Sequence, residues 1–270
     1  MESSSPSVRP SVRPSVPTDG VPETVVVVPC YNEAARLPVE AFERFLAEPH
    51  DVGFLLVNDG SRDTTLSLLR ELAARHGNGT VEVLDLGTNQ GKAEAVRRGL
   101  LRAMERGSSC VGFWDADLAT PLDTILDFKA LLDQRPAVDW VIGARVRLLG
   151  RRIDRHTSRH LLGRVFATVA SLALGIAVYD TQCGAKLFRR NGTLEAVLKQ
   201  RFGSRWLFDV ELIGRYLNVR RSQGEPTPED RIVEFPLHTW IDVGGSKLHA
   251  TDFIRAFFEL LGIWYRLKKY

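Results

Sequence analysis

Short apolar runs alternate with segments of helical spacing through the first half of this 270-residue chain. The pattern predicts strands at residues 24–28, 54–57, 81–86 and 110–114. It predicts helices between and after them, at about residues 33–46, 63–75, 91–106 and 124–134. Strict alternation of strand and helix is typical of parallel βαβ units in an open, Rossmann-like α/β sheet. Ligands of such sheets bind at the carboxyl ends of the strands.

The composition argues against some classes of protein. Basic and acidic residues nearly balance, 36 against 33, which gives no reason to expect a nucleic acid as partner. Three widely separated cysteines fit reduced thiols in a cytosolic protein. Residues 1–22 carry an SVRP repeat and lack the apolar run of a signal peptide, so we expect a disordered tail there. The oligomeric state is left open.

Two apolar segments in the second half are candidates for contact with a membrane surface. Segment 160–178 is interrupted by Arg164 and two glycines and sits at the lower length limit for a bilayer span, which favours a buried or interfacial helix. Segment 253–270 is amphipathic, rich in aromatic residues and basic at its end. Packing on the core and contact with a membrane surface both remain open for it. We therefore expect a cytoplasmic protein with a possible peripheral contact at the membrane face.

Asp115 and Asp117 follow the apolar run at residues 110–114. Where a strand gives way to a turn, both carboxylates can converge on one ion. Mg²⁺ and Mn²⁺ prefer oxygen ligands and bind through one or two carboxylates plus substrate phosphates. The alternative is an Asx turn, since Asp is common at strand ends for its local hydrogen bonds. Polar segments also follow the other predicted strands, and one crevice could gather them all: residues 29–33, 58–61, 89–92 and 115–117.

Eight motifs in order along the chain resemble the family 2 glycosyltransferases of the GT-A fold, specifically the dolichyl-phosphate β-glucosyltransferase and dolichol-phosphate mannose synthase branch. They are VVVVPCYNE, LLVNDGSRDTT, NQGKAEAVRRG, FWDADLATP, IGARV, DTQCGAKLFRR, RWLFDVELI and GGSKL. The likeness runs from about Val25 to the C terminus. It implies a GT-A domain over residues 23–248, with a mostly parallel open sheet flanked by helices, and an amphipathic helix at 249–270 on the acceptor side.

The resemblance also implies the site residues. Donor-binding positions are Pro29, Tyr31, Asn32, Glu33, Asp59, Lys92, Asp115, Gln182, Ser246 and Lys247. Acceptor-binding positions are Arg145, Arg159 and Trp206, and the catalytic positions are Asp117, Asp209 and Glu211. The metal ligands, for Mg²⁺ or Mn²⁺, are Asp115 and Asp117.

Each assignment has a physical reading beside it. Guanidinium forks suit bidentate binding of an acceptor phosphate. A lysine at a helix start suits a diphosphate, as does a glycine-rich loop that closes over it, here at 244–248. Asn32 can equally cap a helix that has Glu33 in its first turn. Three positions depart from common family choices: Asn58, Ala93 and Ala119.

The implied activity is an inverting, metal-dependent transfer of glucose from UDP-glucose to a polyprenyl or dolichyl phosphate. Such an acceptor is largely ionised and needs little help from a base. A soluble hydroxyl acceptor, the main alternative, would need a general base, for which Asp209 or Glu211 is the candidate. GDP-mannose as donor and an inactive nucleotide-sugar binding module also remain open. A dinucleotide-dependent oxidoreductase is disfavoured, because no GxGxxG pattern follows the first strand.

Overall fold

The computed structural model describes residues 21–77, 79–154, 157–243 and 250–268, with the backbone alone at 157–165 and 250–257. The expected tail at 1–22 therefore lies almost entirely outside the described residues. Ser246 and Lys247 lie outside them as well.

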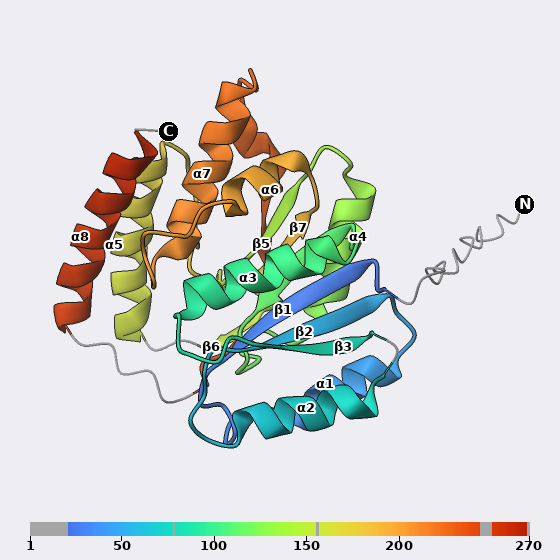
Figure 1. Cartoon of the computed structure of the whole chain (residues 1–270). Coiled ribbons are helices and arrows are strands. Elements are labelled where there is room, and N and C mark those ends of the chain that lie inside the picture. The colour runs from blue at the N-terminus through green and yellow to red at the C-terminus, as the bar shows by residue number, and fades with distance from the viewer. Residues whose placement is uncertain (1–20, 78, 155–156, 244–249, 269–270) are drawn as a thin grey trace, which may run out of the picture.

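Within the described residues, seven strands form one sheet in the order β3-β2-β1-β4-β7-β5-β8 (Figure 1). Their bounds are β1 Thr24–Cys30, β2 Val52–Asn58, β3 Val81–Asp85, β4 Cys110–Trp114, β5 Trp140–Ala144, β7 Ala185–Arg189 and β8 Ile232–Pro236. Strand β7 runs antiparallel to both of its neighbours, and the other pairs are parallel. Beside this sheet, β6 (Arg152–Asp154) pairs with β9 (Thr239–Ile241). The predicted mostly parallel α/β fold is confirmed.

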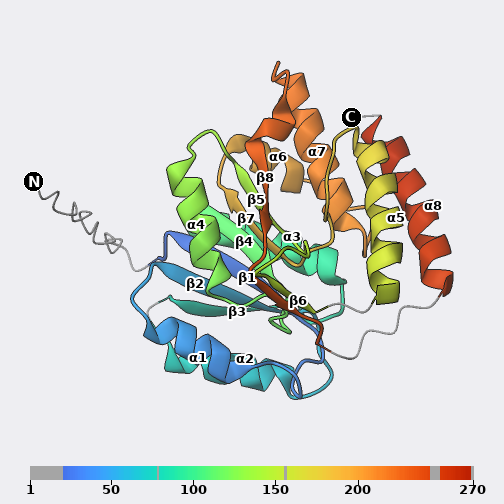
Figure 2. The same cartoon turned by 180° about the vertical axis from the view of Figure 1, so that it is seen from behind.

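Helices cover both faces of the sheet (Figures 1 and 2). One face carries α1 (Val39–Ala47), α2 (Thr65–Arg75) and α4 (Thr124–Gln134). The other carries α3 (Lys92–Glu105), α6 (Gly192–Leu198) and α7 (Phe208–Ser222), with α5 (Thr157–Leu174) and α8 (Ala250–Leu267) packed outside α7. A 3₁₀ turn, η1 (Pro228–Arg231), precedes β8. Each face thus has its own apolar cluster, as a sheet buried on both sides requires.

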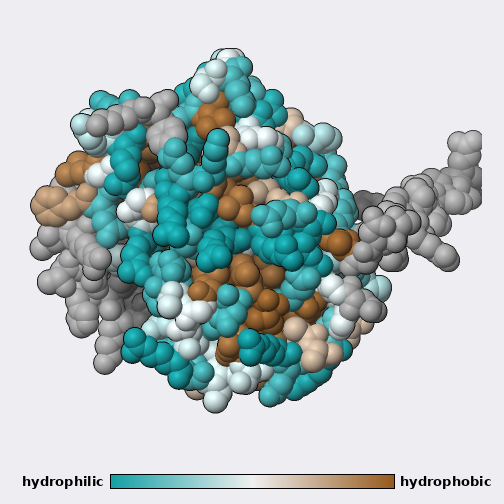
Figure 3. Space-filling view, in the orientation of Figure 1, coloured by the Kyte–Doolittle hydropathy of each residue, from teal (hydrophilic) through white to brown (hydrophobic). Residues whose placement is uncertain are grey.

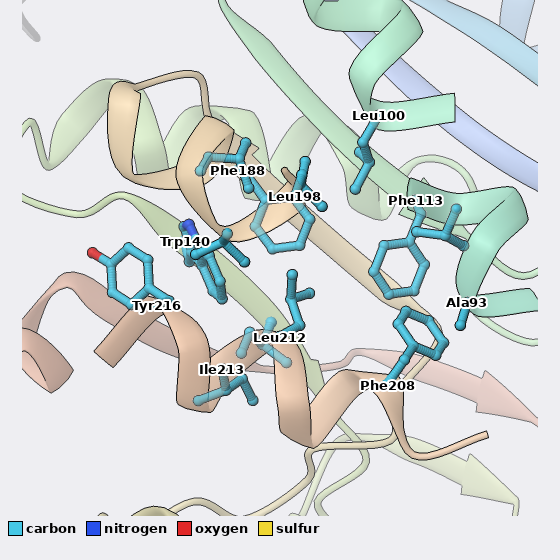
Figure 4. Close-up of a cluster of buried hydrophobic side chains, with 14 of the residues drawn as sticks. Ala93, Leu100, Phe113, Trp140, Phe188, Leu198, Phe208, Leu212, Ile213 and Tyr216 are labelled. Carbon is cyan, nitrogen blue, oxygen red and sulfur yellow. The ribbon is translucent and has the colours of Figure 1, made fainter. Parts of the chain in front are cut away.

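Aromatic side chains fill the core between the sheet and α7. Trp140 packs edge-on against Phe188 with ring centroids 4.8 Å apart, and Phe113 lies 5.7 Å from Phe208 (Figure 4). Tyr216, also buried, stands 4.2 Å from Trp140. These contacts join strands β4, β5 and β7 to the helix that follows them. They therefore fix α7 against the half of the sheet that contains the antiparallel strand β7.

The predicted alternation of strands and helices is confirmed from 24 to 134, and α4 and β4 have the predicted limits. The predicted helix at 33–46 is wrong over its first part, because α1 begins at Val39, after Pro38. A proline disfavours the helical conformation of the residue before it. Asn32 is accordingly not the cap of this helix, and it adopts a left-handed backbone with φ 55°.

The two apolar segments of the second half form α5 and α8. Helix α5 covers most of segment 160–178, as predicted. Leu260 and Ile263 of α8 are buried at 2% and 0% exposure against the core. Phe258, Leu261, Trp264 and Tyr265 of the same helix are exposed, and apolar side chains come to the surface at that edge of the molecule (Figure 3). In the part of the chain that the structure describes, no helix is both long and apolar enough to span a bilayer.

Candidate active site

A cavity of about 360 Å³ opens where strands β1, β2 and β4 end at the same edge of the sheet. The segments that follow β1, β2, β3 and β4 all contribute to its wall. The lining residues are Pro29, Cys30, Tyr31, Glu33, Arg36, Asp59, Asn89, Gly91, Lys92, Asp115, Ala116 and Asp117. The structure therefore brings the four predicted polar segments together, because parallel strands deliver their outgoing loops to one side.

The acidic pair lies at the end of β4. The Asp115 amide donates to the Gly184 carbonyl at 2.9 Å, and its carboxylate pairs with the Lys92 ammonium. Asp117 Oδ1 accepts the amide of Ala119 at 3.1 Å, so the Asx turn weighed as the alternative is present too. Burial raises the pKa of Asp117, against the pull of this hydrogen bond, and the charge of Asp115 raises it further. Both carboxylates still face the cavity.

The residues present fit a divalent cation that shares its shell with a substrate. Among the described residues, no three or more His, Cys, Asp or Glu side chains are grouped as a metal site. Two carboxylates with phosphate oxygens are, however, the usual surroundings of Mg²⁺ in nucleotide enzymes. Asp115 and Asp117 line the same cavity and supply that donor set. To bind the cation, the Asp115 carboxylate would have to leave its ion pair with Lys92.

Asp59 shapes the loop that presents Lys92. The residue is 3% exposed, and its carboxylate accepts the backbone amides of Gln90 at 2.6 Å and Gly91 at 2.8 Å. Burial raises the pKa of Asp59, while these two hydrogen bonds oppose the rise. Gly91 has φ 91°, a conformation that favours glycine, at the N-terminus of α3. Asp59 thus lines the cavity as predicted, with its carboxylate also engaged by the backbone of the loop.

Lys92 opens helix α3 with its side chain 40% exposed at the cavity wall. Desolvation disfavours the charged ammonium, but the carboxylates of Asp115 and Asp209 outweigh it and raise the pKa of Lys92. The side chain is therefore a cation held beside the acidic pair. An incoming diphosphate would meet this charge and the start of α3 together.

Arg36 joins the lining without having been predicted from the sequence. Its guanidinium donates twice to the Glu33 carboxylate, at 3.0 Å and 2.6 Å. Burial raises the pKa of Glu33, against the effect of Arg36. A basic residue three positions after an acid is the signal that could have found this pair. Tyr31 stands beside it with 40% of its surface exposed, so its ring is available to a ligand.

Asn32 and Asn58 lie next to the cavity lining and tie its loops together. The backbone N–H of Asn32 donates to Ser61 Oγ at 3.0 Å, and the side-chain Oδ1 of Asn32 accepts from the backbone N–H of Arg62 at 2.9 Å. Asn58 is 2% exposed, donates through Nδ2 to Asp85 Oδ1 at 2.8 Å and accepts the Ser61 amide at 3.2 Å. Asn58, where the family usually has Asp, therefore binds neighbouring loops and does not line the cavity.

Asn58→Asp is expected to destabilise the protein at neutral pH. The hydrogen bond from Asn58 lowers the pKa of Asp85, so it stabilises the fold above the ordinary pKa of that carboxyl and is lost as the pH falls through the lowered pKa. In Asn58→Asp a second carboxylate faces Asp85, and the two charges repel each other. This repulsion raises the pKa of one of the two acids, so the contact destabilises the fold at pH values where both are ionised. We expect a loss of about 1–3 kcal/mol in unfolding free energy at pH ~8, shrinking towards pH ~4.

Urea unfolding at the two pH values measures this difference. Asn191→Asp is the matched control, because Asn191 Oδ1 accepts the Leu194 amide as the N-cap of α6 and Asp serves equally well there. An equal loss at both pH values in Asn58→Asp would contradict the expected repulsion.

Two of the predicted acceptor residues, Arg145 and Trp206, are not among the residues that line the cavity. Arg145 forks onto Asp180 at 2.6 Å and 2.7 Å, and its guanidinium lies 5.3 Å from the Trp240 ring centroid. Trp206 is 43% exposed in the segment before α7. Arg159 lies in α5, where the side chain is outside the described residues. Gln182, predicted to bind the donor sugar, is not in the lining that the described residues form, and among those residues its buried Nε2 has no hydrogen-bond partner.

Asp209 and Glu211, the candidate bases, are both buried near the start of α7. Asp209 is 5% exposed and bonds Lys186 Nζ at 2.6 Å. Glu211 is 1% exposed, accepts the amides of Gly203 and Ser204, and pairs with Arg215 at 2.6 Å. Neither belongs to the cavity lining. The sequence motif marks both as polar positions but does not reveal these buried partners.

The sheet, its reversed strand and the cavity at the ends of β1 and β4 define the GT-A fold of glycosyltransferases. Glucosyl-3-phosphoglycerate synthase of Mycobacterium tuberculosis, solved with Mn²⁺, UDP-glucose and phosphoglyceric acid, has a TM-score of 0.62 at 17% identity. The match covers 91% of this chain and 79% of that one. TarS 1-349 of S. aureus, solved with UDP-GlcNAc, has a TM-score of 0.55 at 17% identity, and the match covers 89% of this chain and 66% of that one.

The chain belongs to glycosyl transferase family 2, whose profile matches residues 25–195. Dolichyl-phosphate β-glucosyltransferase of Drosophila melanogaster is 33% identical over 260 residues, covering 90% of this chain and 75% of the relative. The enzyme of that name from Homo sapiens is 31% identical over 238 residues, covering 83% and 68%. This chain is therefore a glycosyltransferase enzyme similar to the dolichyl-phosphate β-glucosyltransferases, which confirms the family resemblance.

Proposed function

We propose that this enzyme transfers glucose, with inversion, from UDP-glucose to a polyprenyl or dolichyl phosphate. The observation that carries the proposal is the cavity in which the Asp115 and Asp117 carboxylates stand beside the Lys92 ammonium. The names of the similar proteins support the sugar and the acceptor, and the Mycobacterium tuberculosis synthase contains Mn²⁺ with UDP-glucose. Asp115 and Asp117 would hold Mg²⁺ or Mn²⁺, which neutralises charge on the departing diphosphate.

The remaining donor contacts follow from the cavity wall. Lys92, once released by Asp115, would bind a phosphate oxygen, and the N-terminus of α3 would favour the same anion. The exposed ring of Tyr31 offers a face to the uracil base, and Glu33 and Asp59 offer carboxylates to its polar edge or to the ribose. Ser246 and Lys247, outside the described residues, remain proposed contacts of the diphosphate. Gln182 remains a proposed partner of a sugar hydroxyl.

A phosphate acceptor agrees with the environment of the two candidate bases. Burial raises the pKa of Asp209 against the effect of Lys186, and Glu211 already serves two amides and Arg215. A neutral hydroxyl would need a base with free access to its proton. A phosphate monoester is largely ionised at neutral pH and attacks without one. The acceptor contacts proposed from the motifs stay Arg145, Arg159 and Trp206.

The test is a transfer assay with labelled UDP-glucose, polyprenyl phosphate in detergent and Mn²⁺ or Mg²⁺. A metal-dependent, lipid-extractable product supports the proposal. The absence of such a product at any metal concentration would remove it, and product from GDP-mannose in preference to UDP-glucose would overturn the donor. Transfer to soluble hydroxyl acceptors would favour the alternative acceptor class. Binding of UDP-glucose without transfer or hydrolysis would leave an inactive binding module.

We further propose that α8 lies against an anionic membrane surface, where a lipid-linked acceptor would be found. The exposed Phe258, Leu261, Trp264 and Tyr265 share one helix with Arg266 and Lys268 in and just after its last turn. The Lys268 ammonium sits 3.8 Å from the Trp264 ring centroid. Aromatic and aliphatic side chains beside cations are the composition of helices that lie in the headgroup region. Arg266 is paired with Glu211 at 3.4 Å, so Lys268 is the cation that would favour an anionic lipid surface over a neutral one.

Leu261→Glu is expected to weaken vesicle binding about tenfold or more, because burial of a leucine side chain is worth about 1.5–3 kcal/mol. Sedimentation with phosphatidylglycerol and phosphatidylcholine vesicles measures the binding, and thermal unfolding checks the fold. Leu126→Glu is the matched control, since Leu126 is similarly exposed, at 39% against 47%, but lies on α4. Wild-type protein that stays in the supernatant, or equal binding by the two variants, would rule out docking through α8.

A further inference from the structure

One lysine lies wholly inside the protein, two residues beyond the turn that contacts Asp115. Lys186, at 0% exposure on β7, donates from Nζ to Thr181 O at 3.0 Å, to Cys183 O at 2.6 Å and to Asp209 Oδ1 at 2.6 Å. These bonds use all three hydrogens of the ammonium. Lysine is almost never fully buried unless it is paired. The family motifs give Lys186 no role of its own, yet two of its partners belong to the turn that contacts Asp115.

The turn that Lys186 holds lies directly against Asp115. Residues 181–184 precede β7, and β7 pairs with β4 so that Ala185 stands opposite Trp114. The Gly184 carbonyl accepts the Asp115 amide, and a side chain at position 184 would overlap the Asp115 carboxyl group. A shift of this turn would therefore move the Asp115 carboxylate. Lys186 fixes two carbonyls of the turn, one on either side of Gln182.

Asp209 holds the inner end of this arrangement. Its Oδ1 accepts from Lys186 Nζ at 2.6 Å, and the residue is 5% exposed near the start of α7. Lys186 therefore ties α7 to the turn before β7. The 181–184 turn is held between α7 on one side and Asp115 on the other.

We propose that Lys186 and Asp209 are positioning residues for donor binding: Asp209 anchors Lys186, and Lys186 holds the 181–184 turn against Asp115. The inference rests on the proposed function, in which Asp115 and Lys92 meet a metal-bound diphosphate. It gives Asp209 a role other than that of a general base. A purely structural pair is the competing explanation, and it predicts lower stability without a local effect at the cavity.

Hydrogen exchange separates the two explanations without any ligand. In the double variant Lys186→Met, Asp209→Asn, the buried pair is neutralised together, so no buried charge is left alone. We expect faster deuterium uptake in peptides covering residues 113–119 and 181–187. The matched control is Arg220→Met, Asp139→Asn, which neutralises the ion pair between the partly buried Arg220 of α7 and the buried Asp139 just before β5, at the far end of the strands. Equal uptake at 113–119 in the two double variants would overturn the proposal.

Calorimetry with Mn²⁺ and UDP gives the second readout. Loss of side chains that orient a metal ligand commonly lowers metal affinity about 10- to 100-fold, and we expect a fall in this range for the Lys186 and Asp209 double variant. The control pair should bind as the wild type does. A wild type that binds no Mn²⁺ with UDP would refute the proposed donor site, while the exchange data would still decide whether the pair positions Asp115.

A single variant keeps the test open if the double variant does not fold. Asp209→Asn retains an oxygen that accepts from Lys186 but loses the charge that anchors its ammonium. We expect this variant to take up deuterium faster than the wild type at 113–119 and 181–187 and to bind Mn²⁺ with UDP several-fold more weakly. Wild-type uptake and affinity in a folded Asp209→Asn would overturn the anchoring role of Asp209.

Discussion

Asp117→Asn is expected to lower kcat/KM for sugar transfer by about 1,000-fold, because stabilisation of a leaving oxygen by a metal is worth several kcal/mol and about 1.4 kcal/mol is tenfold in rate. Asparagine has the same shape and keeps an oxygen for the Ala119 amide, so the turn after β4 persists. The loss then reports the missing charge. Initial rates at several Mn²⁺ concentrations measure it, with the donor saturating and limiting in turn.

The control is Asp127→Asn, which removes an exposed carboxylate from α4, away from the cavity lining. Its activity should equal that of the wild type. Transfer by Asp117→Asn within tenfold of the wild type would show that the acidic pair forms an Asx turn and nothing more. The metal assignment would then be lost together with the proposed mechanism.

Gly184→Ala is expected to reduce the affinity for Mn²⁺ with UDP about 10- to 100-fold, the range found when the support of a metal ligand is removed. The added Cβ would overlap the Asp115 carboxyl group, which must turn away. Overpacking at such a contact also destabilises a protein by about 1–3 kcal/mol. Calorimetry and thermal unfolding measure the two effects separately.

Gly192→Ala carries the same substitution into open space at the first turn of α6, where a Cβ meets no atom within 4 Å. This control should bind and unfold as the wild type does. Wild-type affinity in Gly184→Ala would mean that the Asp115 carboxylate can move without consequence, against its assignment as a ligand.

Local periodicity predicted the strands and helices of the donor half well, but in the second half it predicted helices at α5 and α8 and none of the strands. Strand β4 and helix α4 have their predicted limits, because apolar runs and helical spacing are local signals. Strand β7 contains a fully buried lysine, which reads as a surface residue in any sequence. Its burial depends on Asp209, 23 positions away, and no local pattern expresses such a pairing.

The candidate site follows the same division. The polar segments after β1 to β4 were predicted to meet, and they line one cavity, because the topology of a parallel sheet places them at one edge. Arg36 was missed, and the surroundings of Arg145, Asp209 and Glu211 were not foreseen. Arg36 pairs locally with Glu33, whereas the other three side chains are bound by partners from other segments of the chain. Family motifs mark such positions but do not give their contacts.

The reversed direction of β7 bears on how this scaffold can be altered. The loops that follow β1, β2 and β4 lie at the ligand edge of the sheet. Because β7 is antiparallel to β4, the loop that precedes β7, residues 180–184, lies at the same edge. The connection that leaves β7 after Arg189 emerges at the far edge, level with the beginning of β4. An attachment point for a label therefore belongs on the second connection, because changes in the first would disturb its contact with Asp115.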